Sequence, residues 1–272
     1  MPLLVALALV PAASAPIADA PAPPAGARGL WPGESVTVRG TRSVVVGRAA
    51  PTTSSAEPAS SVSLVELARL ADTAALRVGA VLGEPVRPLV IVPASAAEAA
   101  RLAGTSPIDG LAALADGDRV LVVPEVFARL NPTGRDVVLT HELTHVAAGT
   151  DRLPVWLYEG FADYVGYRDS GLPVRTAAAE LADEVRAGRL PGELPGSAAF
   201  AADGSDPARL ARAYQESWLA CRFLADRFGE ETLVRLYREA RVAGADRALA
   251  GLGLSTATLT DRWRAYVREQ LA

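Results

Sequence analysis

The chain has only two histidines, and they lie four residues apart in the segment VVLTHELTHV, residues 137–146. This spacing constrains the local fold, because residues four apart in an α-helix point in nearly the same direction and are separated by about 6 Å along the axis. We therefore predict a helix over about residues 134–148, with Thr133 as its N-cap and its last turn near Gly149. His141 and His145 then present their imidazoles on one face.

Two imidazoles on one helical face are suited to bind one divalent ion, and zinc takes imidazole nitrogen at about 2.0–2.1 Å. Glu142 follows the first histidine and completes the pattern His-Glu-x-x-His. In that pattern the glutamate is not a ligand, and it acts as a general base toward water activated by the metal. The alternative is a pair of ordinary core or surface histidines. Chance produces this arrangement of two histidines and a glutamate only roughly once in two thousand chains, which favours the metal site.

A catalytic zinc takes three protein ligands and leaves one position open. The chain has no third histidine and a single cysteine, Cys221, so we predict a carboxylate as the third ligand. Glu159 lies in the second turn of a predicted helix over residues 155–168, which Pro154 starts. An antiparallel arrangement of the two helices brings Glu159 to the histidines, and we expect Gly160 to let the two backbones approach closely.

Asp163 lies one turn after Glu159 on the same helical face. We predict that it accepts the free N–H of a metal-binding histidine, because such imidazoles usually need an acceptor behind them. The alternative is that both acids lie on a solvated face. Burial is favoured by the apolar residues around them, which are Trp156, Leu157, Phe161, Ala162 and Val165.

The hydrophobic pattern changes in the middle of the chain. Before Pro132 we expect a hairpin around Gly40, helices over residues 63–83 and 96–104, and strands within residues 87–95 and 119–123. After it we expect helices over about residues 134–148, 155–168, 176–187, 207–228, 230–242 and 258–271. This organisation predicts an α+β fold, with a small mixed β-sheet and its helices followed by a mainly helical lobe. The predicted domain spans residues 29–272, with a sheet-containing lobe over 29–132 and a helical lobe over 133–272.

Residues 1–28 differ in composition from the rest. An apolar run of eight residues from Leu3 to Val10 precedes the small-residue pattern Ala13-Ser14-Ala15, followed by an Ala/Pro-rich stretch. The run is too short to span a bilayer and resembles a secretory signal followed by a linker. We therefore expect export to the cell envelope or beyond it, and the alternative is a disordered cytoplasmic tail.

The overall charge argues against two classes of partner. A formal net charge of −4 gives no basic excess to attract phosphate backbones or anionic lipid. We expect no nucleic-acid partner and no stable membrane span, and the sequence defines no oligomeric state.

The two motif helices together resemble the gluzincin zinc metallopeptidases, and most closely the bacterial peptidase-MA-like group. The first matches the family pattern H-E-L-x-H, and the second, from Pro154 to Tyr164, matches P-x-W-L-x-E-G-x-A-[DE]-Y. A weaker similarity extends over roughly residues 85–271. The resemblance implies a zincin-like fold whose active-site helix carries the histidines, a bound Zn2+ ion and hydrolysis of peptide bonds. Thirteen residues separate His145 from Glu159, fewer than in the thermolysin-like and aminopeptidase branches, so we expect a tight turn between the helices.

The resemblance also implies roles outside the metal site. By similarity to the aminopeptidase branch, Tyr214 is the candidate donor to the oxyanion that forms during hydrolysis, and Tyr158, Tyr164 and Tyr167 are rivals. The expected substrate is an extended polypeptide that adds to the edge of the small sheet. The strand within residues 118–123 is the expected edge.

A non-catalytic zinc-binding or surface interaction module that keeps the zincin fold is the main alternative function. A structural zinc is normally closed by a fourth protein ligand and has no need of a base. The combination of three ligands with Glu142 therefore favours the hydrolase.

Overall fold

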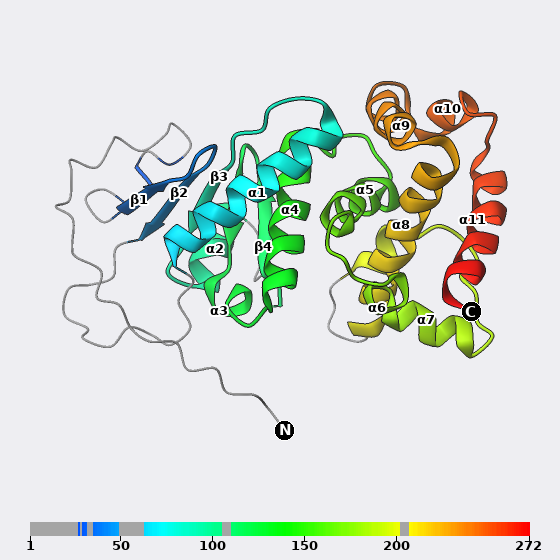
Figure 1. Cartoon of the computed structure of the whole chain (residues 1–272), viewed down its shortest axis with the longest axis horizontal. Helices are drawn as coiled ribbons and strands as arrows, with labels where there is room; N and C mark the ends of the chain where they lie inside the picture. Colours follow the sequence, from blue (N-terminus) through cyan, green and yellow to red (C-terminus); the bar gives the residue numbers. More distant parts are fainter. Residues whose placement is uncertain (1–26, 28, 32–34, 49–62, 105–109, 202–206) are drawn as a thin grey trace.

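The computed structural model describes residues 27, 29–31, 35–48, 63–104, 110–201 and 207–272. A five-stranded sheet with its helices forms one half of the molecule, and a set of helices forms the other (Figure 1). This confirms the predicted mixed α+β organisation with a mainly helical C-terminal part. The signal-like segment lies outside the described residues, so export and the domain boundaries stay predictions. No helix within the described ranges has the length and apolar character needed to cross a membrane.

The sheet has the strand order β1-β2-β3-β5-β4. β1 (Ser35–Arg39) and β2 (Val44–Arg48) form the predicted hairpin, and β3 (Leu89–Val92) and β5 (Arg119–Val122) continue the sheet in parallel. β4 (Ala113–Asp116) pairs antiparallel with β5 and forms the edge. The prediction that residues 118–123 form the edge strand was therefore wrong, because β4 covers that side of β5.

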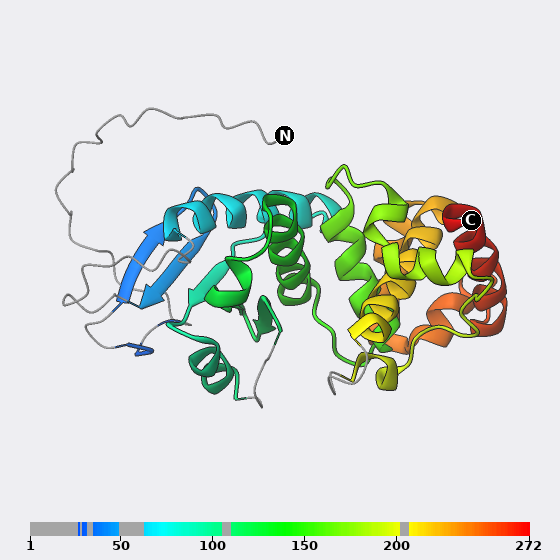
Figure 2. The same ribbon diagram turned by 90° about the horizontal axis from the view of Figure 1, so that it is seen from below.

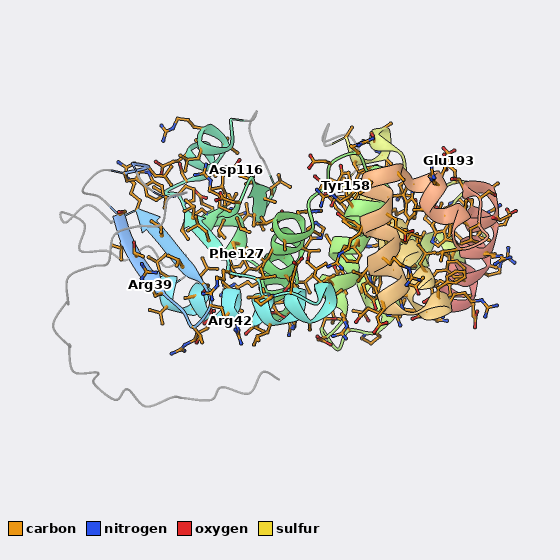
Figure 3. The ribbon with its side chains drawn as sticks, turned by 90° about the horizontal axis from the view of Figure 1, so that it is seen from above. Arg39, Arg42, Asp116, Phe127, Tyr158 and Glu193 are labelled. Carbon is orange, nitrogen blue, oxygen red and sulfur yellow. The ribbon has the colours of Figure 1, made fainter. Side chains whose placement is uncertain are left out.

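The inner strands β2, β3 and β5 have buried residues on both faces of the sheet, to which successive side chains point in turn. One face packs against α1 (Leu64–Leu82) and the helix that carries the histidines. The opposite face packs against Trp31. α2 (Ala96–Ala103) and α3 (Pro124–Phe127) complete this half, and the fully buried Phe127 lies in its interior (Figure 3).

The second half is helical (Figure 2). Its helix α8 (Pro207–Phe228) packs against α5 (Val155–Tyr167), α7 (Ala179–Arg186), α9 (Glu230–Ala243) and α11 (Thr256–Leu271). The predicted helix over residues 176–187 is divided at Ala178, whose ψ of 46° interrupts the helical backbone. The other helices within the described residues are α4 (Pro132–Ala148), α6 (Val174–Ala177), α10 (Ala245–Ala250) and the short 3-10 helix Ser197–Phe200.

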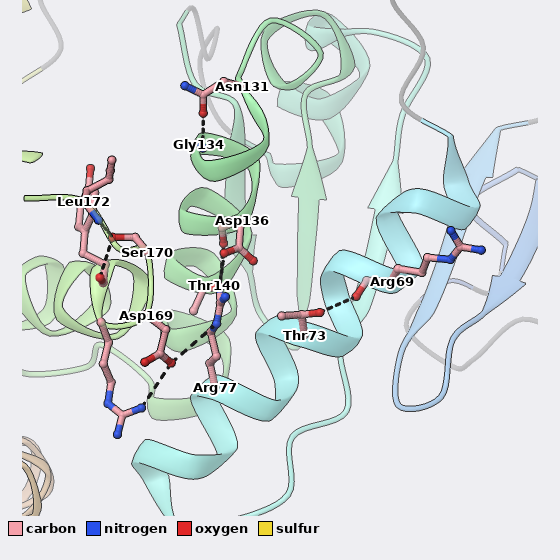
Figure 4. Close-up of polar contacts among 12 residues, drawn as sticks. Arg69, Thr73, Arg77, Asn131, Gly134, Asp136, Thr140, Asp169, Ser170 and Leu172 are labelled. Atoms are coloured by element: carbon pink, nitrogen blue, oxygen red, sulfur yellow. Dashed lines mark hydrogen bonds and ion pairs between the residues drawn. The ribbon is translucent and has the colours of Figure 1, made fainter. Parts of the chain in front are cut away.

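The N-terminus of α4 is fixed by a side-chain cap and by an ion pair (Figure 4). Asn131, and not the predicted Thr133, caps the helix by accepting the N–H of Gly134 at 2.7 Å. The cap lies earlier than predicted because Pro132 already has the backbone suited to the first turn. Arg77 of α1 pairs with Asp136, which connects α4 to the helix that covers the sheet.

Asp72 of α1 holds the turn of the β1–β2 hairpin. Its carboxylate accepts the backbone N–H groups of Thr41, Arg42 and Ser43 at 2.6–2.9 Å, and the hydroxyl of Ser43 at 2.8 Å. Burial raises the pKa of Asp72, but the N–H groups of Arg42 and Thr41 outweigh burial and hold the pKa below its ordinary value of 3.8. The ionised carboxylate therefore stabilises the fold above that value.

We expect Asp72→Asn to lower the free energy of unfolding by about 1–2 kcal/mol at pH 7, because the introduced amide places donors against backbone donors. The folded pKa is the lower one, so this contribution is present above the ordinary pKa and is lost as the pH falls through the folded pKa. Urea denaturation of both proteins between pH 7 and pH 3 measures the difference. Asp261→Asn, an exposed substitution on α11, is the control. Equal stabilities of wild type and Asp72→Asn at pH 7 would contradict the assignment.

Candidate metal centre

The structure brings the three predicted ligands to one point. The Nε2 atoms of His141 and His145 on α4 lie 3.0 Å apart. Oε2 of Glu159 on α5 lies 3.1 Å from Nε2 of His141 and 3.4 Å from Nε2 of His145. These three residues form the one group of possible metal ligands found among the described residues.

The spacing of the three atoms fits zinc. Ligands at 2.0–2.1 Å around a tetrahedral ion are separated from each other by about 3.3 Å. The measured separations of 3.0–3.4 Å lie close to that value. Two imidazole nitrogens and one carboxylate oxygen are also the donor types that a catalytic zinc takes when its fourth position stays open.

The two histidines differ in the hydrogen bonding of Nδ1, the ring nitrogen that does not face the other ligands. Nδ1 of His141 lies 2.7 Å from Oδ1 of Asp163, and both side chains are buried. This contact places Asp163 where the sequence predicted it, and it directs Nε2 of His141 toward Glu159. Nδ1 of His145 is buried and has no hydrogen-bond partner within the described part of the chain.

The approach of α4 and α5 depends on a tight turn and on a glycine that the sequence analysis did not select. Arg152 in the turn has a φ of +64°, which reverses the chain within residues 149–154. A Cβ at Gly166 would lie 3.1 Å from the carbonyl oxygen of Val137, so this glycine allows the contact of α5 with α4. Gly160 instead faces α8, where a Cβ would lie 2.1 Å from the carbonyl oxygen of Ser217. The predicted role of Gly160 between the motif helices was wrong.

The C-terminal end of α4 is held by α9, which lies about ninety residues later in the chain. The hydroxyl of Tyr237 donates to the carbonyl oxygen of Gly149 at 2.6 Å. The guanidinium of Arg241 donates to the carbonyl oxygen of Ala148 at 2.5 Å. The last carbonyl groups of a helix lack partners within it, and a positive charge there is favourable. α9 therefore fixes the end of the helix nearest His145.

Charge is concentrated in the centre. Burial lowers the pKa of His141, but the carboxylates of Asp163 and Glu159 outweigh burial and hold it well above its ordinary value. Burial raises the pKa of Glu159, but hydrogen bonds from His141 and His145 lower it to about 2. Glu159 is therefore ionised at neutral pH and can bind a cation.

Glu142 is not one of the three converging residues, and its carboxylate contacts the edge of the sheet. Its Oε2 accepts the backbone N–H of Ala115 on β4 at 2.8 Å. Burial raises the pKa of Glu142, and the neighbouring histidines oppose this effect. The contact at Ala115 was not predicted from the sequence because β4, which contains Ala115, was not predicted. The signal was the Gly117-Asp118 pair before a β-branched run, which is typical of a two-residue hairpin turn.

Two cavities adjoin the centre. One of about 470 Å³ is lined mostly by apolar side chains, including Leu111, Val126, Leu130, Val138, Leu210 and Trp218. The other, of about 530 Å³, is more polar and includes His145, Thr150, Asp151, Tyr158 and Glu159. His141, Glu142, Ala113 and Tyr214 line both cavities, so the centre lies where they meet.

The candidate tyrosines lie in different places. The ring of Tyr214 is 6.2 Å from that of His141, and the ring of Tyr158 is 5.8 Å from that of His145. Figure 3 shows Tyr158 on the side of the helical half that faces the sheet half. Tyr167 packs on Trp218 in the apolar cavity. Tyr164 donates its hydroxyl to Glu230 at 2.8 Å and is engaged away from the histidines.

No protein-family model matches the chain, and no curated protein matches its sequence. Crystal structures of the M1 zinc metallopeptidase from Deinococcus radiodurans and of a mutant of that enzyme align with TM-scores of 0.42 and 0.43, at 20% and 18% identity. The alignments cover 88% of this chain and 51% of those chains, so it spans about half of their length.

We expect Asp163→Asn to weaken zinc binding by about ten- to a hundredfold, because His141 loses the carboxylate that orients its ring and raises its basicity. Competition with a chromophoric chelator measures the affinity. Asp169→Asn, which changes a carboxylate just after α5 that pairs with Arg168, is the matched control. Equal zinc affinities of Asp163→Asn and wild type would show that Asp163 does not support a metal ligand.

Proposed function

We propose that the protein is a zinc-dependent peptidase of the gluzincin type, with His141, His145 and Glu159 as the metal ligands. The observation that carries this proposal is the convergence of the three ligand atoms within 3.0–3.4 Å of each other, next to a partly buried glutamate that is not one of them. The proposal rests on the chain's own geometry and on its two sequence motifs.

Zinc bound there supplies Lewis acidity toward a peptide carbonyl and toward water. Glu142 takes the proton of the attacking water and returns it to the leaving amine. Burial raises the pKa of the Glu142 carboxyl group in the direction of neutral pH. This favours a group that must first take up a proton and then release it. Asp163 fixes the orientation of His141 throughout the reaction.

Tyr214 is the proposed donor to the oxyanion of the tetrahedral intermediate. Burial, together with the charge of Glu159, raises the pKa of its hydroxyl above the ordinary value, so it keeps its proton. Within the described residues the hydroxyl has no recorded hydrogen-bond partner, and Tyr214 lines both cavities. Tyr158 is the main rival because it also adjoins the histidines.

The proposed substrate is an extended polypeptide that lies along β4. Edge strands bind such chains through main-chain hydrogen bonds, without a requirement for a particular side chain. The cavity of about 470 Å³ beside Glu142 suits a large apolar side chain of that polypeptide. The second cavity, of about 530 Å³, suits polar groups on the other side of the centre.

The alternative is a non-catalytic zinc-binding module. It keeps the three ligands but gives Glu142 no chemical role. Zinc binding is common to both functions, and dependence on Glu142 separates them.

We expect Glu142→Gln to retain zinc and to lower kcat for casein or a peptide library by about 10²–10⁴-fold, because the amide accepts no proton. Metal content is measured by atomic emission and cleavage by mass spectrometry of the products. Glu125→Gln on α3, an exposed position, is the control and should cleave as the wild type does. If the wild type binds zinc and no cleavage depends on Glu142, the binding module is correct.

We expect Tyr214→Phe to lower kcat by about 10²–10³-fold with little change in KM, as loss of one oxyanion donor does. Tyr158→Phe, measured in parallel, tests the rival hydroxyl. Unchanged turnover by Tyr214→Phe removes this residue from the mechanism, and a loss confined to Tyr158→Phe transfers the role.

A further inference from the structure

The edge of β4 presents alternate residues outward. In an antiparallel pair, residues that exchange backbone hydrogen bonds alternate with residues whose N–H and C=O point away from the partner strand. The N–H of Val123 donates to the carbonyl oxygen of Ala112 at 2.8 Å, which places Ala112 among the bonded residues. The register pairs Ala113 with Val122 and Ala115 with Val120. The backbone N–H and C=O groups of Ala113 and Ala115 therefore point away from β5, at the edge of the sheet that faces α4.

The outward backbone groups of Ala115 and Ala113 have different contacts. The N–H of Ala115 donates to Oε2 of Glu142 at 2.8 Å, across the contact between β4 and α4. Within the described ranges it is the only recorded donor to that carboxylate. Ala113 lies where the two cavities meet, and no hydrogen bond of its outward groups is recorded among the described residues.

We propose that the backbone N–H of Ala115 positions Glu142 as the general base, an inference that rests on the proposed peptidase function. The hydrogen bond fixes one carboxylate oxygen of Glu142 and leaves the other for the proton of the attacking water. A glutamate side chain has several rotatable bonds, and its position decides the distance over which the proton moves. The edge strand supplies this restraint from outside the helix that carries Glu142.

This assignment gives β4 two separate tasks. Ala115 restrains the base, and Ala113, two residues earlier, keeps its outward N–H and C=O for main-chain pairing with a substrate. A substitution that removes one N–H should therefore affect catalysis, and the same substitution two residues away should affect binding. Proline removes a backbone N–H and is tolerated on an edge strand where that N–H faces outward.

Amide hydrogen exchange tests the contact without any measurement of activity. We expect the Ala115 amide of the zinc-free wild type to exchange slowly and to accelerate by about tenfold or more in Glu142→Ala, which removes the acceptor. Glu142→Gln keeps a side-chain carbonyl and should retain the protection. The Leu114 amide, which bonds to β5, is the internal reference for the strand and should not change. Equal exchange of Ala115 in wild type and Glu142→Ala would overturn the proposal.

Kinetics test the positioning role. We expect Ala115→Pro to lower kcat by about ten- to a hundredfold with nearly unchanged KM and zinc content. Ala113→Pro is the matched variant and should mainly raise KM. A wild-type kcat for Ala115→Pro, or the same split between kcat and KM in both variants, would overturn the positioning role. If the wild type cleaves no peptide, the proposed function fails, and the exchange comparison still decides whether Ala115 holds Glu142.

Discussion

The candidate centre depends on the antiparallel packing of α4 against α5. α4 supplies two imidazoles at a spacing fixed by the helix itself, and α5 supplies the carboxylate that faces them. The distance between the helices is set by Gly166, where any side chain would press against the backbone at Val137. A larger separation would leave Glu159 out of reach of both histidines. The convergence of these three side chains is therefore a consequence of one helix–helix contact and of the short turn that precedes it.

This contact brings more negative than positive charge into a small volume. Glu142, Glu159 and Asp163 lie around two imidazoles, and burial of charged groups is costly unless they are paired. Asp163 is compensated by His141, and Glu159 by both histidines. Imidazoles that bind a metal must be neutral, so a bound divalent cation would take over the role of imidazole protons in offsetting the negative charge of the surrounding carboxylates. The excess of acidic over basic side chains around this point is therefore a reason, independent of the ligand spacing, to expect a cation here.

The parts of the site that the sequence predicted are the parts that depend on local geometry. His141, Glu142 and His145 follow from the period of one helix, and Glu159 and Asp163 follow from the next helix after a short turn. β4 was missed because its four residues, ALAD, show little strand pattern. The contacts of Tyr237 and Arg241 with the end of α4 join segments about ninety residues apart. No periodicity within either segment encodes such a contact.

α4 carries His141, His145 and Glu142, and it is restrained from several directions. Asn131 and the pair of Arg77 with Asp136 act at its beginning, and α9 acts at its end. α5 faces the histidines, whereas β4 faces Glu142. The position of Glu142 relative to the three converging side chains is thus determined by both halves of the molecule, through one helix that contacts each of them.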